Sequence, residues 1–108
     1  MVQELNEETF QKNILQSKKP IIVDFWAEWC APCKILSPIF EELEKEMNTK
    51  IDFAKINVDK FQIIAQENDI RGIPCLIIFQ KGKEADRIIG LHSKEEMKKI
   101  IENAIGEY

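Results

Sequence analysis

A strand-length apolar run that leads through two closely spaced cysteines into a helical pattern constrains this chain most. The run Ile21–Trp26 is apolar except for Asp24, as is typical of a strand covered on both faces. The sequence WCAPC follows at residues 29–33, and a helical pattern continues from Lys34. Two cysteines at this spacing either hold a metal ion or cycle between a dithiol and a disulfide. Because a helix start offers unpaired N–H groups and a positive dipole end, it stabilises a thiolate and favours redox chemistry.

The composition is that of a globular protein with one core. The chain has 108 residues, of which 44% are hydrophobic and 31% charged, so we expect a single domain over residues 1–108. The net charge of −4 and the lack of a basic patch make nucleic acid an unexpected partner. The longest apolar runs have strand length, which predicts no membrane segment. The acidic N-terminus shows no targeting pattern, and we expect a cytoplasmic monomer.

The periodicity changes along the chain in the order β-α-β-α-β-α-β-β-α. Strands are expected at residues 2–5, Ile21–Trp26, 51–58, 76–79 and 87–89. Helices are expected from a cap at Asn6 to the Lys19-Pro20 pair, over residues 32–47 and 60–68, and after a capping box of Ser93 and Glu96. The strand–helix–strand units imply parallel pairing, and a hairpin around residues 81–83 adds antiparallel strands. The pattern predicts a mixed central sheet with helices on both faces.

The supply of metal ligands separates the two interpretations of the cysteine pair. A structural zinc site needs four ligands, usually cysteine or histidine. Beyond the pair, the chain offers only Cys75 and His92 of these two types. We therefore favour a redox pair, and half of a zinc site remains the alternative.

Several motifs together make this sequence similar to the thioredoxin family over essentially its whole length. The run DFWAEWCAPCK at residues 24–34 resembles the active-site segment of the family, and Pro38 falls where its active-site helix is kinked. KINVD at residues 55–59 resembles the end of the central strand, RGIP at residues 71–74 the cis-proline loop, and two later glycines also match, Gly82 and Gly90. Ala31 departs from the commoner glycine, and Cys75 from the usual threonine. The resemblance implies an α/β thioredoxin fold, with a central mixed five-stranded sheet flanked by four helices.

The resemblance also implies a division of labour in the site. Cys30 is the expected nucleophile that attacks a target disulfide, and Cys33 is the resolving thiol. Asp24 would accept the proton of Cys33, with Lys55 tuning its charge, and burial is expected to raise the pKa of Asp24. The alternative is a tolerated buried acid paired with Lys55.

The expected substrate-binding surface surrounds Cys30. It comprises Trp29, Ala31, Pro32, Ile73, Pro74, Gly90 and Leu91. Pro74 would be cis and leave the backbone of Ile73 free to pair with an extended substrate, although an ordinary trans proline is the commoner state. Cys75 is expected to be a small buried hydrophobe, and a third thiol that traps Cys30 or Cys33 is the alternative.

The implied function is a protein-disulfide reductase with no bound cofactor. Its partners would be disulfide-containing targets and a thioredoxin reductase that draws reducing equivalents from NADPH. Two alternatives remain: an oxidase or isomerase that uses the same cysteines, and a binding module in which the cysteines are incidental.

Overall fold

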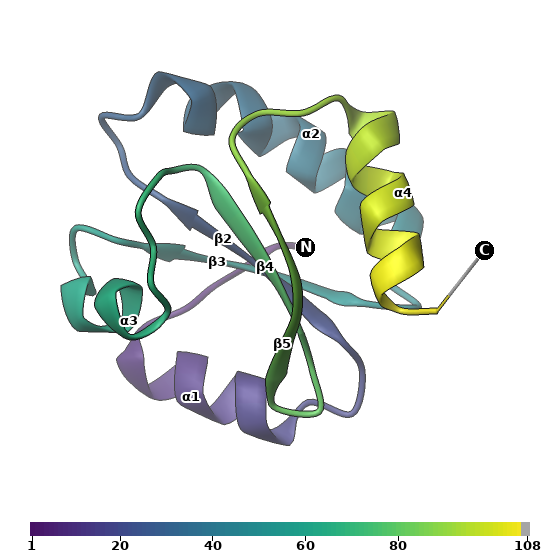
Figure 1. The fold of residues 1–108 in the computed structure, drawn as a ribbon, viewed down its shortest axis with the longest axis horizontal. Coiled ribbons are helices and arrows are strands. Elements are labelled where there is room, and N and C mark those ends of the chain that lie inside the picture. Colours follow the sequence, from purple (N-terminus) through teal and green to yellow (C-terminus); the bar gives the residue numbers. More distant parts are fainter. Residues whose placement is uncertain (107–108) are drawn as a thin grey trace.

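The computed structural model describes residues 1–106, which form five strands and four helices in the order β1-α1-β2-α2-β3-α3-β4-β5-α4 (Figure 1). The strands are β1 (Gln3–Glu4), β2 (Ile21–Trp26), β3 (Asp52–Asn57), β4 (Cys75–Gln80) and β5 (Lys83–Ile89). The helices are α1 (Glu7–Gln16), α2 (Ala31–Met47), α3 (Gln62–Glu67) and α4 (Lys94–Ala104).

All five strands form one mixed sheet in the order β1-β3-β2-β4-β5. β3 pairs in parallel with both β1 and β2, whereas β4 pairs antiparallel with both β2 and β5. The predicted mixed five-stranded sheet with four helices is therefore confirmed. β2 lies at its centre, so its apolar sequence is explained by burial on both faces.

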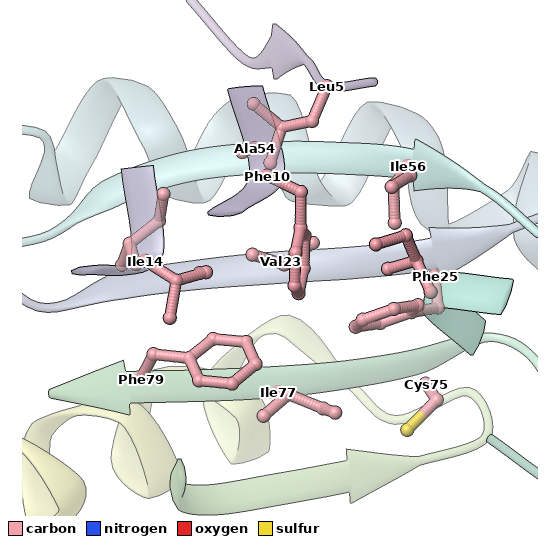
Figure 2. Close-up of a cluster of buried hydrophobic side chains, with 12 residues drawn as sticks. Leu5, Phe10, Ile14, Val23, Phe25, Ala54, Ile56, Cys75, Ile77 and Phe79 are labelled. Carbon is pink, nitrogen blue, oxygen red and sulfur yellow. The ribbon is translucent and has the colours of Figure 1, made fainter. Parts of the chain in front are cut away.

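The sheet separates two hydrophobic cores. α1 and α3 cover one face, and α2 and α4 cover the other (Figure 1). Figure 2 shows the core under α1, here called the α1-side core, which includes Phe10, Ile14, Val23, Phe25, Ile77 and Phe79. The α2-side core includes Ile22, Leu36, Phe40, Leu43, Leu76, Ile78 and Met97. Because successive strand residues point to opposite faces, neighbours in β2 alternate between the two cores.

Side-chain caps start the first and last helices where the sequence predicts them. The side chain of Asn6 accepts the N–H of Thr9 at 2.9 Å. At α4, Ser93 accepts the N–H of Glu96 at 3.1 Å, and the Glu96 carboxylate accepts the N–H of Ser93 at 3.4 Å. These bonds satisfy donors that a helix start leaves unpaired.

The structure corrects several expected boundaries. β5 begins at Lys83 rather than at residue 87, because pairing with β4 continues through exposed polar residues that carry no apolar pattern. α3 is confined to Gln62–Glu67, and β3 is one residue shorter at each end than expected. Ile35 shares the spacing of the apolar face of α2 but is 55% exposed. Among residues 1–106, no helix combines the length and apolarity needed to cross a membrane.

Candidate active site

The two cysteines lie where β2 has ended and α2 begins. Cys30 and Cys33 form a disulfide with their Cα atoms 5.2 Å apart. Cys30 is the N-cap of α2, and its Sγ accepts the backbone N–H of Cys33 at 3.2 Å. A sulfur in this place faces the positive end of a 17-residue helix, which favours its thiolate form in the reduced protein.

Apolar side chains surround the disulfide. Cys30 and Cys33 are 3% and 4% exposed, and Ile73 packs against the cluster that they form with Ala27. The Ile73–Pro74 peptide bond is cis, and the carbonyl of Pro74 accepts the N–H of Gly90 at 2.9 Å. The loop before β4 is thereby joined to the chain that leaves β5.

The residues expected to bind substrate differ in exposure. Trp29, Ala31, Pro32 and Leu91 are exposed, Ile73 and Gly90 are half-buried, and Pro74 is buried. Their backbone segments are the α2 start, the loop before β4 and the segment after β5.

Asp24 is a buried acid in the middle of β2. It is 4% exposed, and burial raises its pKa from 3.8 to about 7, although the positive charge of Lys55 opposes this shift. Lys55 is its register partner on β3, and its Nζ also lies 5.3 Å from the ring centre of Trp26. Oδ1 of Asp24 has no hydrogen-bond partner among the described residues.

A pocket of about 300 Å³ joins this acid to the disulfide. Asp24, Lys55 and Cys33 all line it, together with Trp26 and Ser37. The structure therefore brings the expected proton acceptor, its cation and the expected resolving cysteine to one pocket. An acid with a pKa near 7 in such a pocket is able to take up or release a proton near neutral pH.

Trp29, the residue before Cys30, borders a separate groove of about 420 Å³, here called the Trp29 groove. Its lining also includes Val58, Ile70, Arg71, Gly72 and Ile73. Trp29 is 70% exposed, and its indole N–H donates to Oδ2 of Asp59 at 2.8 Å. The sequence analysis gave no role to Asp59. A signal was present, because Asn57 and Asp59 follow the end of a strand as Asn-Val-Asp, and such polar residues often support a turn through their side chains.

Cys75 directly follows Pro74, and its side chain belongs to the α1-side core. It is 1% exposed, it forms no disulfide, and burial raises the pKa of its thiol. Figure 2 shows it within the α1-side core, with its side chain beside those of Ile77 and Phe25. In the sheet, Asp24 on β2 is the register partner of Leu76 on β4, and the side chain of Leu76 belongs to the α2-side core. Cys75 therefore packs as a small hydrophobe.

No metal-binding group emerges from the part of the chain that the structure describes. Within residues 1–106, no three residues among His, Cys, Asp and Glu are arranged so as to hold a metal ion. His92 instead contacts the carbonyl of Ile89 through Nε2 at 3.0 Å. A disulfide at a strand-to-helix junction, beside a buried acid, defines a thiol–disulfide oxidoreductase.

Comparison with known proteins identifies the family. A sequence model described as thioredoxin matches residues 1–103. The chain is 38% identical over 105 residues to a thioredoxin of Rickettsia bellii, covering 97% of this chain and 100% of the relative. It is 45% identical over 98 residues to a thioredoxin of Buchnera aphidicola, covering 91% of this chain and 90% of the relative. It is 40% identical over 101 residues to an M-type chloroplastic thioredoxin of Spinacia oleracea, covering 94% of this chain and 56% of the relative.

The chain belongs to the thioredoxin family. Its Cys30–Cys33 pair is the CxxC pair of a protein-disulfide oxidoreductase, as the sequence predicts. The expected thioredoxin fold is confirmed with it.

Proposed function

We propose that this protein reduces disulfides in protein targets, with Cys30 as the nucleophile and Cys33 as the resolving thiol. The observation that carries the proposal is the position of Cys30 as the N-cap of α2, where its sulfur accepts a backbone N–H. This environment favours the thiolate, which is the attacking form in thiol–disulfide exchange.

In the first step, the Cys30 thiolate of the reduced protein attacks one sulfur of the target disulfide. A Cys30–target disulfide forms, and the other target sulfur leaves with its electron pair and takes a proton from solvent. The flat apolar surroundings of Cys30 are compatible with many target sequences. An extended target segment would pair with the backbone of Ile73, as in strand addition.

In the second step, Cys33 loses its proton to the carboxylate of Asp24 and attacks the sulfur of Cys30. The Cys30–Cys33 disulfide forms, and the second target sulfur leaves and is protonated. The target has then gained two electrons and two protons in total. Support for the role of Asp24 comes from its pKa of about 7 and from the pocket that it shares with Cys33 and Lys55.

The disulfide form must then be reduced again by a partner. We infer that a thioredoxin reductase supplies the two electrons, drawn from NADPH, and that the protein itself carries no bound cofactor. Similarity to thioredoxins of two bacteria, Rickettsia bellii and Buchnera aphidicola, supports a cytoplasmic location.

Insulin reduction with purified variants tests the proposal. The wild-type protein is expected to reduce insulin disulfides with NADPH and a bacterial thioredoxin reductase, and Cys30→Ser to abolish this turnover. Cys33→Ser is expected to accumulate a covalent complex with insulin, because the mixed disulfide can form but not resolve.

Cys75→Ser is the matched control, because it also removes one thiol but from the α1-side core. It is expected to keep the wild-type rate. Insulin reduction that survives Cys30→Ser would contradict the proposal. A measured reduction potential more oxidising than that of the target disulfides would favour an oxidase or isomerase instead.

A further inference from the structure

Asn57, the last residue of β3, is a buried polar residue to which the exchange mechanism gives no role. It is 6% exposed. Its Oδ1 accepts the backbone N–H of Asp59 at 2.9 Å and that of Lys60 at 3.2 Å. Its own carbonyl accepts the N–H of Phe61 at 3.1 Å. One residue therefore binds three successive backbone N–H groups and fixes the turn between β3 and α3.

This turn carries the partner of Trp29. The carboxylate of Asp59 accepts the indole N–H of Trp29 at 2.8 Å, and Trp29 directly precedes Cys30 in the chain. Because Trp29 is 70% exposed, packing restrains its ring little, and the hydrogen bond to Asp59 sets where the ring lies. The position of Asp59 in turn depends on the backbone that Asn57 holds.

We propose that Asn57 is a positioning residue that fixes Trp29 through Asp59 and thereby sets the shape of the Trp29 groove for a target polypeptide. The inference rests on the proposed function, because the groove matters to exchange only if a target chain lies in it. A small disulfide reaches Cys30 without filling the groove. Asn57 therefore determines selectivity for protein disulfides over small disulfides, rather than the reactivity of the cysteines.

Solvent exchange of the Trp29 indole proton, measured by NMR on ¹⁵N-labelled protein, tests the structural link without any activity assay. Asn57→Ala is expected to speed this exchange, and Asn57→Asp, which keeps the acceptor oxygen, is expected to preserve the wild-type rate. Trp29→Phe assigns the resonance. The indole of Trp26 is the internal reference, because its Nε1 has no hydrogen-bond partner within residues 1–106.

The kinetic test compares two substrates for the same dithiol protein: insulin and 5,5′-dithiobis(2-nitrobenzoic acid). For Asn57→Ala, the ratio of the insulin rate constant to the small-disulfide rate constant is expected to fall about fivefold, as for the loss of one net hydrogen bond. Asp59→Ala breaks the same link at its exposed end and is expected to lower the ratio alike. The Trp29→Phe variant lacks the indole donor. In this background, neither Asn57→Ala nor Asp59→Ala is expected to lower the ratio further.

Two results would overturn the inference. One is an unchanged Trp29 exchange rate and an unchanged ratio in folded Asn57→Ala. The other is an equal loss of rate for both substrates, which indicates a general structural role. If Asn57→Ala does not fold, Asn57→Ser is expected to give the same faster exchange and lower ratio. The serine side chain is shorter than that of asparagine, and its hydroxyl cannot reach both N–H groups. Failure of the proposed function would be distinguishable from failure of this inference. A wild-type protein that does not reduce insulin would contradict the proposed function, whereas the NMR test of the link between Asn57 and Trp29 would still apply.

Discussion

Asp24 is the residue where the proposed chemistry and the stability of this protein conflict. In an unfolded chain an aspartic acid loses its proton near pH 4, whereas burial delays this loss in the folded protein to about pH 7. Between these two pH values the folded state binds more protons than the unfolded state. The free energy of unfolding therefore falls as the pH rises through this window. Above pH 7 the full destabilisation from burying the charged carboxylate is present.

The variant Asp24→Asn is expected to be more stable than wild type at pH 8, by on the order of 4 kcal/mol, and to lose most of this advantage at pH 4. The reason is that asparagine carries no charge to desolvate. Urea denaturation of the oxidised protein at several pH values measures the difference. Asp86→Asn, at an exposed position on β5, is the control and is expected to show no such pH-dependent gain.

The same variant is expected to slow the release of mixed disulfides, since Cys33 would lose the proton acceptor that we propose for it. Stopped-flow mixing of the dithiol form with a target disulfide resolves this step from the first attack. Wild-type release kinetics in Asp24→Asn would remove Asp24 from the mechanism and leave it as a tolerated buried acid.

Single residues also show where sequence reasoning reached its limit. Cys30, Cys33 and Asp24 stand out because a thiol pair and an acid in an apolar strand are chemically unusual. Asn57 and Asp59 do not, because their importance comes from side-chain bonds to local backbone and to Trp29, 30 residues before Asp59. Such bonds follow no helical or strand period, and the only signal in the chain is the short Asn-Val-Asp sequence, which predicts a turn but not its contact with Trp29.

Among the elements, β5 carries an arginine that joins it to the start of the loop that precedes β4. Arg87 donates to both carboxylate oxygens of Glu84 at 2.6 Å, and this bond holds the pKa of Glu84 below its ordinary value. The same guanidinium donates to the carbonyls of Asn68 at 3.0 Å and of Asp69 at 3.3 Å. The segment so held leads directly to Ile73 and Pro74.

Arg87→Ala is expected to lower the free energy of unfolding by about 1–3 kcal/mol, because it removes charge-assisted bonds and unpairs two carbonyls. Arg87→Lys is expected to recover only part of the loss, since an ammonium cannot reproduce the forked geometry. Denaturant titration measures both. Arg71→Ala is the matched control: its side chain is 85% exposed and pairs with Asp69, so a change within about 0.5 kcal/mol is expected. Equal losses in Arg71→Ala and Arg87→Ala would contradict this role of Arg87.

Elements with strong patterns were predicted well, and those with weak patterns were not. α2, α4 and β2 have apolar periods or caps that their own residues supply. The first half of β5 has neither, because an edge strand needs only a partner on one side and tolerates polar residues on both faces. It forms because it pairs with β4, and only two residues separate the two strands in the hairpin.

The molecule as a whole is expected to be a monomer in solution. Its sheet has two open edges, but β1 is two residues long and β5 presents charged side chains, which oppose pairing between copies. A bulge between Ile78 and Phe79 further distorts the β4–β5 ladder at that edge. Sedimentation velocity at several concentrations is expected to give one species of about 12.6 kDa. A concentration-dependent dimer would show that the exposed apolar residues around Cys30 associate instead.

The division of the interior by the central sheet has a consequence for adaptation. The pocket of Asp24 and Cys33 opens on the α2 face, whereas Phe10 and Ile14 fill the other core from α1. Phe10 and Ile14 line neither this pocket nor the Trp29 groove, so substitutions there in a lineage that moves to a hotter habitat are expected to change heat resistance and leave disulfide exchange intact. Under α2 such changes are expected to be more constrained, because Cys30 caps this helix and Cys33 lies within it, so selection is expected to act on the two halves at different rates.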